Sequence, residues 1–286
     1  ARIIAEDPKS AEIIKPFLRG RDVKRWRVQF ADRYLIKIES SENVQHPWSG
    51  MGNQQAEKCF AKCFPAVYHH LRPQWQALVA RSDQGHYCWE LRSCAYWEEF
   101  EKPKIIIPAI TARPCFSLDH AGFFSNNKST IFMVRSTGYS AGVLNSSVNA
   151  WFATQVCQKK QNGCFDFEPR YSSQLIVPYA NAQQEESISA VVSAIVSTED
   201  LRFERLSNGL VCELFFPEDL HGAGIRLFDA LAQTGLAGLA GLTGDALVSA
   251  ASALADTLFA EGHPVHALLS ALDGLEVVRL IEGGDA

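Results

Sequence analysis

Residues suited to binding a polyanion lie directly before an isoleucine-rich run. Arg92, Lys102 and Lys104 can contact phosphates, and Tyr96 can stack on planar groups. Residues 105–107 are all isoleucine. Because three consecutive β-branched side chains fit a strand covered on both faces better than an exposed helix, this run predicts a buried strand. The alternative is an ordinary buried strand whose polar edge binds nothing.

A second basic group, Arg19, Arg21, Lys24 and Arg25, crowds a glycine-containing turn. The segments RWRVQF and YLIKI that follow alternate in polarity and predict two strands of a hairpin turning about residues 31–33. The basic group then lies at the root of this hairpin. It has three interpretations, which the sequence leaves open: phosphate contacts, docking to another domain, or a solvated charged loop.

A third polar group is suited to reading base edges. Asn126, Asn127 and Lys128 lie between two strand-like runs, CFSL and TIFMV, and Arg113 precedes the first of these runs. Asparagine pairs in a bidentate way with adenine, and lysine or arginine with guanine, in the major groove. We expect Arg92, Tyr96, Arg113, Asn126, Asn127 and Lys128 to approach bases. The same Asn-Asn-Lys sequence is also typical of a routine turn.

The elements that position these groups change character along the chain. A helix is expected at residues 8–18, another with its apolar face on Val67, Leu71, Trp75, Leu78 and Val79, a strand at residues 87–92, helix at residues 138–157 and a last strand at residues 175–177. Helical spacing then predominates, at residues 183–216, 245–260 and 264–272. The helical part either packs against upstream domains or forms a self-contained cap.

The charge of the chain is unevenly distributed. The whole chain has 27 Lys+Arg and 32 Asp+Glu, a net charge of −5, which by itself argues against a nucleic-acid binder. Residues 1–180 nevertheless hold 23 basic and 16 acidic residues, a net charge of +7, while residues 181–286 hold 4 and 16, a net charge of −12. This asymmetry indicates a polyanion partner for the first part and a solvated or protein-facing role for the second.

Eight cysteines are scattered without a disulfide framework and predict reduced thiols. Cys59 and Cys63, near His69 and His70, suggest zinc, but a proline interrupts the segment and no Cys-x-x-Cys pair occurs, so structural cysteines are favoured. No apolar run reaches the roughly 20 residues of a membrane span. A chain that opens at Ala1 in the middle of a pattern is expected to be an excised fragment.

Several segments, taken in order, resemble one known family. They are IIKPFLRGRDVKRW, FPAVYHHLRPQW, ALVARSDQGHYCWELR, FEKPKIIIPAI, GVLNSSVNAWF and, at the end, LIVPYA. In order and spacing they are similar to the TaqI-like C-terminal specificity domain of type IIG restriction-modification enzymes and adenine-specific DNA methyltransferases. The resemblance implies an α+β target recognition domain with a mixed β-sheet and flanking helices at residues 1–180, followed by a helical C-terminal extension at residues 181–286.

The resemblance also implies a function. The chain is expected to recognise double-stranded DNA as a specificity fragment in the cytoplasm, as part of bacterial defence, and to partner an upstream methyltransferase domain of the same polypeptide. Phosphates would be held by Arg19, Arg21, Lys24, Arg25, Lys102 and Lys104. The fragment is expected to be neither an enzyme nor a binder of cofactor, metal or membrane, since S-adenosylmethionine, and Mg²⁺ where a nuclease is present, belong to the parent enzyme.

Two other classes of function remain. A protein-interaction module would dock the methyltransferase domain through the helical extension and would not bind DNA itself. A thiol or zinc enzyme would use Cys59, Cys63 and the neighbouring histidines. The sequence carries none of the motifs GxGxxG, GxxxxGK[ST] or HExxH, nor a methyltransferase tetrad of the Asn-Pro-Pro-Tyr type.

Overall fold

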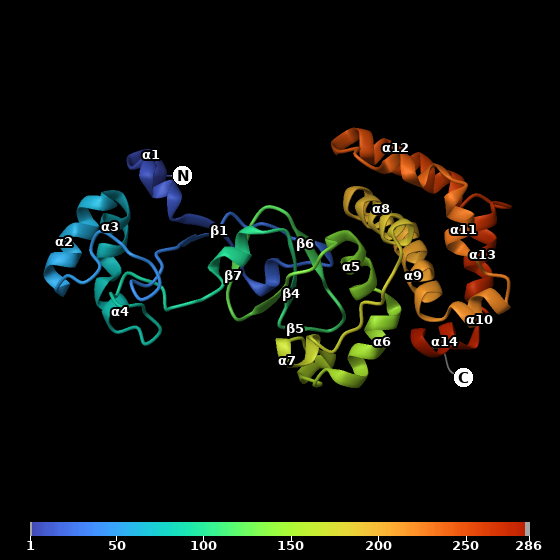
Figure 1. Cartoon of the computed structure of the whole chain (residues 1–286), viewed down its shortest axis with the longest axis horizontal. Helices are drawn as coiled ribbons and strands as arrows, with labels where there is room; N and C mark the ends of the chain where they lie inside the picture. The colour runs from blue at the N-terminus through green and yellow to red at the C-terminus, as the bar shows by residue number, and fades with distance from the viewer. Residues whose placement is uncertain (1, 284–286) are drawn as a thin grey trace. The chain divides into compact units, whose positions relative to one another are not determined.

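The computed structural model of the chain describes residues 2–283, which divide into two compact units. The first unit comprises residues 2–18, 30–102 and 121–124, and the second comprises residues 19–29, 103–120 and 125–283. The chain therefore passes between the units several times (Figure 1). Helices occupy the last part of the chain and mixed strands lie before them, so the fold is α+β.

The first unit combines a small sheet with short helices. Strands β1 (Ile14–Leu18) and β3 (Tyr34–Ile36) pair antiparallel in a three-stranded sheet of order β3-β1-β7, where β7 is Phe124–Ser125. The helical elements are α1 (Arg2–Glu6), η1 (Pro8–Glu12), α2 (Asn53–Cys63), α3 (Pro65–Leu71), η3 (Arg72–Gln74), α4 (Trp75–Val79) and η4 (Trp97–Glu101).

An aromatic core with a buried carboxylate holds the first unit together. The ring of Trp89 stacks with those of Phe60 and Tyr87, at centroid distances of 5.1 and 4.9 Å. Glu90 has no exposed surface and accepts hydrogen bonds from Trp48 Nε1 at 2.9 Å and from the backbone N–H of Tyr87 at 3.2 Å. Because a buried carboxylate is tolerated only when it is hydrogen-bonded, this residue fixes the segments that meet around it.

The second unit is built on a mixed sheet of four strands, in the order β2-β6-β4-β8. Strand β4 (Lys104–Pro108) is central and buried along its whole length, and it pairs antiparallel with β6 (Ser117–Asp119) and β8 (Ser129–Phe132). Strand β2 (Trp26–Arg27) pairs parallel with β6. A separate antiparallel pair joins β5 (Ile110–Thr111) to β9 (Phe165–Asp166). The isoleucine run thus forms the buried strand that the sequence predicted.

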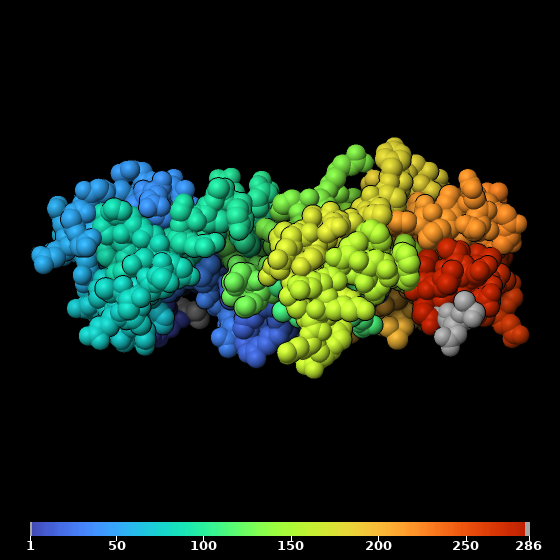
Figure 2. Space-filling model, turned by 90° about the horizontal axis from the view of Figure 1, so that it is seen from below, coloured from blue at the N-terminus to red at the C-terminus, as the bar shows by residue number. Residues whose placement is uncertain are grey.

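Helices of the second unit share one core with this sheet. They are α5 (Thr137–Leu144), α6 (Ser147–Val156), α7 (Pro169–Ser172), α8 (Ala182–Thr198), α9 (Leu201–Phe215), α10 (Pro217–Gly222), α11 (Leu227–Ala232), α12 (Gly244–Leu258), α13 (Pro264–Leu272) and α14 (Glu276–Glu282), with η5 (Gln161–Gly163) and η6 (Gly235–Leu239) between them. A Cβ on Gly142 would lie 2.4 Å from Ile188 Cγ2, so α5 and α8 approach closely. Helix α6 packs against α14, and Figure 2 shows the yellow-green segment that contains α6 next to the red C-terminal segment.

The predicted boundary after residue 180 does not coincide with a break in packing. One hydrophobic cluster includes Ile105 of the sheet, Val143 of α5, Val191 of α8 and Val278 of α14. Residues 181–283 consequently belong to the same compact unit as the four-stranded sheet. Among the described residues, no helix is both long and apolar enough to cross a membrane.

Several local predictions are wrong. Residues 8–18 form η1 and β1 instead of one helix, because the end of this segment pairs with β3. The segment from Val67 to Val79, expected as one helix, is interrupted at Pro73 and lies in α3, η3 and α4, with Val79 exposed. Residues 87–92 form a turn around Glu90, and residues 175–177 are not in a strand. Helices α8, α9, α12 and α13 lie where the spacing predicted helix.

Candidate nucleic-acid interface

Residues 22–29 form a tight hairpin with four basic or aromatic residues at its tip. Val23 pairs antiparallel with Val28, and the N–H of Lys24 donates to the carbonyl of Arg27 at 3.0 Å. We call residues 24–27 the KRWR turn. Trp26 has a φ of 73°, a left-handed conformation that a bulky side chain rarely adopts. The hairpin predicted about residues 31–33 is wrong, because β3 pairs with β1 and β2 pairs with β6, and the turn that does form lies inside the basic group.

Arg19 precedes this hairpin and is held by Asp22. Its Nε donates to Asp22 Oδ2 at 2.8 Å, and its Nη2 donates to Oδ1 at 2.7 Å. These hydrogen bonds from Arg19 lower the pKa of Asp22 to about 2. Arg21, by contrast, is exposed. Arg19 thus shapes the loop through a bidentate pair, whereas Arg21 presents its charge to solvent.

The polar turn at residues 126–128 lies against this basic loop. A Cβ on Gly20 would lie 2.6 Å from the backbone oxygen of Lys128, so only glycine allows this approach. Asn126 accepts a hydrogen bond from the N–H of Lys128 at 3.1 Å and thereby shapes its own turn. Asn126, Asn127 and Lys128 are all exposed. The structure thus brings together two groups that are more than 100 residues apart in the sequence.

The guanidinium of Arg25 is hydrogen-bonded to other residues of the protein. Its Nε and Nη2 donate to Glu204 Oε2 at 3.2 and 3.1 Å, its Nη1 donates to the carbonyl of Pro114 at 3.2 Å, and its guanidinium lies 4.9 Å from the ring centroid of Trp26. Burial lowers the pKa of Arg25, Glu204 opposes this effect, and the charge of Arg113 lowers it further. Only 15% of the side chain is exposed, so Arg25 has little surface for a phosphate.

Arg113 and Lys24 are two further cations of the second unit. Both side chains are exposed. Burial raises the pKa of Cys115, while the charges of Arg25, Arg113 and Lys24 lower it, which places these three cations around one thiol. We call Arg21, Lys24, Arg113, Asn126, Asn127 and Lys128 the basic surface. It combines side chains that can contact phosphates with side chains that can pair with base edges.

Lys104 has no surface for a phosphate. Its side chain and that of Asp119, its register partner on β6, are both 0% exposed, and Lys104 Nζ lies 2.5 Å from Asp119 Oδ2. The expected phosphate contact of Lys104 is corrected on this ground: the ammonium neutralises a carboxylate inside the sheet. A buried charge requires such a partner, because transfer from water is otherwise strongly unfavourable.

The remaining predicted residues belong to the first unit. Arg92 is exposed, and 54% of Tyr96 is exposed, with its ring 6.0 Å from that of Phe100. Lys102 is exposed and donates to Glu99 Oε1 at 2.7 Å. Their predicted roles in base and phosphate contact remain predictions.

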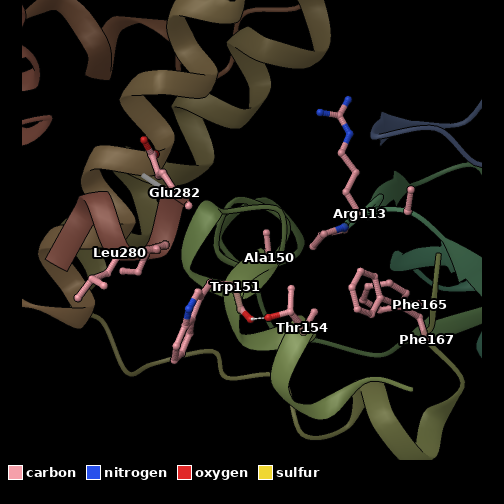
Figure 3. Close-up of a pocket in the computed structure, with 13 residues that line it drawn as sticks. Arg113, Ala150, Trp151, Thr154, Phe165, Phe167, Leu280 and Glu282 are labelled. Atoms are coloured by element: carbon pink, nitrogen blue, oxygen red, sulfur yellow. Dashed lines mark hydrogen bonds between the residues drawn. The ribbon is translucent and has the colours of Figure 1, made fainter. Parts of the chain in front are cut away.

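A shallow hollow of about 320 Å³ lies in the second unit, lined by α6, α14 and the β5 and β9 segments (Figure 3). Trp151 and Leu280 flank it, while the guanidinium of Arg113 extends away from both. Most of its lining is apolar. Arg113 and Glu282 are the charged residues of this lining among those the structure describes, so the hollow lacks a paired acid and base for catalysis.

The cysteines are free thiols. Cys59 and Cys63 lie one turn apart on α2, and burial, followed by Cys59, raises the pKa of Cys63. Over residues 2–283, no three or more His, Cys, Asp or Glu side chains gather in a group that could hold a metal ion. A raised pKa disfavours the thiolate that nucleophilic catalysis requires.

The model of the family described as the TaqI-like C-terminal specificity domain matches residues 15–175. The chain belongs to this family. The match covers the KRWR turn, the four-stranded sheet and the turn at residues 126–128, and thus the whole basic surface. A specificity domain in restriction-modification systems recognises DNA sequence and is not itself catalytic. No curated protein matches the chain.

The sequence patterns did not identify three charged residues of this region, Arg27, Glu199 and Glu204. Glu204 binds both Arg25 and Trp26, and Arg27 pairs with Glu199 at 2.5 Å. Arg27 could have been included with its basic neighbours. No sequence signal identifies Glu204, because its partners lie about 180 residues away and an acidic residue on an amphipathic helix is typical of a solvated face.

Proposed function

We propose that this chain recognises specific sequences in double-stranded DNA as the specificity part of a type IIG restriction-modification enzyme. The observation that carries the proposal is the basic surface, in which the Gly20 to Lys128 approach unites exposed cations with exposed amide side chains. Cations give affinity through phosphates, and asparagine, lysine and arginine discriminate bases at about 1 to 3 kcal/mol for each bidentate pair. Membership of the specificity-domain family also supports recognition of DNA sequence.

The chemistry of the parent enzyme would lie in other domains. A methyltransferase domain with S-adenosylmethionine would modify adenine, and a nuclease with Mg²⁺ would cleave where one is present. The specificity domain would hold the duplex while the target adenine is flipped out, a step that takes a few kcal/mol. We place the complete enzyme in the bacterial cytoplasm, where its role is defence. The residues proposed for phosphate contact are Arg21, Lys24 and Lys102, with Arg19 and Arg25 shaping the loop.

Fluorescence anisotropy tests this proposal with the chain and a pool of random duplexes at several salt concentrations. Replacing Arg21 and Lys24 by alanine should weaken binding and reduce the slope of log K against log salt by about 1.8, since each phosphate contact contributes about 0.9. The matched control replaces Arg226 and Arg279, two exposed arginines of the helical part, and removes the same charge.

The control variant should retain nearly all of the DNA affinity and the salt slope. Equal losses in both variants would mean that net charge alone, and not the basic surface, drives binding. If the unchanged chain does not bind duplex DNA even at low salt, the chain does not bind DNA by itself and the proposal is wrong.

A protein-interaction module is the second candidate, and exposed apolar residues favour it. Ile176, Val177 and Tyr179 are 45%, 40% and 94% exposed in a segment that buried side chains hold in place. Asn149 bonds both backbone groups of Ile176, and the hydroxyl of Tyr139 donates to the carbonyl of Pro178 at 2.6 Å. Docking of the methyltransferase domain through such a segment would respond weakly to salt, unlike DNA binding.

A further inference from the structure

The KRWR turn is held from outside by one carboxylate of the helical extension. Glu204 on α9 accepts from Trp26 Nε1 through Oε1 at 2.6 Å, and from Arg25 Nε and Nη2 through Oε2 at 3.2 and 3.1 Å. Each oxygen therefore binds a different residue of the turn. Arg25 and Trp26 are the two central residues of the hairpin tip, so one side chain from α9 holds both of them.

The turn needs such a contact because its own geometry is unfavourable. Trp26 has a positive φ, which glycine adopts freely and a bulky residue does not. Its side chain is only 5% exposed, and its indole N–H would lack a partner in that environment without Glu204. The carbonyl of Pro114 and the hydroxyl of Ser117 contact the same turn at Arg25 and at Arg27. Strain at this residue is thus balanced by contacts from elements distant in sequence.

We infer that Glu204 is a positioning residue for the basic surface, and that helix α9 is consequently an integral part of the DNA-recognition unit. By fixing Arg25 and Trp26, Glu204 sets the direction in which the adjacent Lys24 projects. The DNA-binding half of this inference rests on the function proposed above. The positioning half rests only on the geometry.

Positioning and electrostatics predict opposite changes in DNA affinity when Glu204 loses its charge, so the direction of the change tests the inference. Removing a negative charge near a polyanion-binding surface should raise affinity for DNA. Loss of positioning should lower it. The variant Glu204→Gln changes the net charge by one unit and preserves the size of the side chain. Glu199→Gln is a matched control, because Glu199 makes a largely exposed pair with Arg27 at the turn between α8 and α9.

Amide hydrogen exchange measured by mass spectrometry tests the positioning half without DNA. In Glu204→Gln, exchange at residues 22–29 should be about tenfold faster, while α12 and the melting temperature stay close to those of the unchanged chain. Glu199→Gln should exchange like the unchanged chain at residues 22–29. Unaltered exchange in Glu204→Gln would overturn the inference.

Anisotropy with random duplexes at low salt tests the DNA half. We expect Glu204→Gln to bind several-fold more weakly and Glu199→Gln to bind equally or more tightly. In a double variant with Arg25→Ala, the two losses of affinity should add to less than their sum, because one of the two Glu204 oxygens acts through Arg25 while the other still holds Trp26. Equal strengthening in the two glutamine variants would overturn the inference. Failure of the unchanged chain to bind DNA would instead overturn the proposed function and the DNA half with it, and exchange would still decide the positioning half.

Discussion

The buried pair of Lys104 and Asp119 can be tested for two different roles of Lys104, one in stability and one in DNA binding. Both side chains are fully buried and their charged atoms are 2.5 Å apart on adjacent strands. At an effective dielectric constant of about 20, the Coulomb attraction at this separation is about 7 kcal/mol. Desolvation of the two ions offsets most of this energy, so the pair as a whole adds little stability relative to apolar residues of similar size.

Removing one partner has a different result from removing both. Lys104→Met leaves the carboxylate of Asp119 in the sheet without its ammonium partner, and we expect the free energy of unfolding to fall by about 3 to 5 kcal/mol. The double variant Lys104→Met with Asp119→Leu should recover most of this loss. Urea unfolding followed by circular dichroism at 222 nm measures both, because the second unit carries most of the long helices.

DNA affinity then separates the two roles. The folded double variant should bind random duplexes within about twofold of the unchanged chain, since Lys104 presents no surface to a phosphate. A loss of less than about 1 kcal/mol in the single variant would refute the reasoning about the pair. A folded double variant with reduced affinity and a smaller salt slope would mean that Lys104 does contact DNA.

Three further predictions concern the packing and the acidic groups. Gly142→Ala should destabilise the second unit by about 1 to 3 kcal/mol in urea unfolding, because its Cβ would clash with Ile188, whereas Ala at the open position Gly238 should have a small effect. Glu90→Leu should unfold the first unit at lower temperature in calorimetry, because buried donors lose their acceptor, and an unchanged transition would contradict this role. The pKa of Asp22 is lowered from 3.8 to about 2 in the folded state, so its pairing stabilises the protein fully above pH 4 and is lost as the pH falls toward 2. Titration of the Asp22 carboxyl by NMR should show a midpoint near 2, and a midpoint near 4 would exclude the pair with Arg19.

Sequence patterns correctly predicted the elements whose conformation depends on their own residues and not on a distant partner. The run of three isoleucines predicted β4, and the spacing of apolar residues predicted α8, α9, α12 and α13. Local periodicity failed where a distant partner decides the conformation. Ile14 and its neighbours were expected in a helix, and they form β1 because β3 offers an antiparallel edge about 20 residues further along the chain. Alternation at residues 87–91 reflects burial of two aromatic rings around Glu90 and not a strand.

The candidate site shows a related limit, because residue type does not reveal exposure. Lys102 and Lys104 are two residues apart and both were expected to contact phosphate, yet the first is exposed and the second is fully buried. Arg21 and Arg25 differ in the same way. In each case an acidic residue on another element, Asp119 or Glu204, determines the outcome. Such pairs form only in the folded chain, so composition and spacing cannot identify them.

The separation of charge along the sequence is therefore not the separation of charge in space. The helical extension has a net charge of −12 by count, but it supplies Glu199 and Glu204 to Arg27 and Arg25 of the basic loop. Both contacts reduce the number of cations free to meet a polyanion, and the contact of Glu204 also holds the loop that presents the remaining cations. Affinity for DNA should then depend less on the total positive charge of residues 1–180 than on the few side chains that the acidic contacts leave exposed and oriented. A protein that uses part of its charge to hold the rest in place loses electrostatic affinity and gains a defined geometry, which sequence recognition requires.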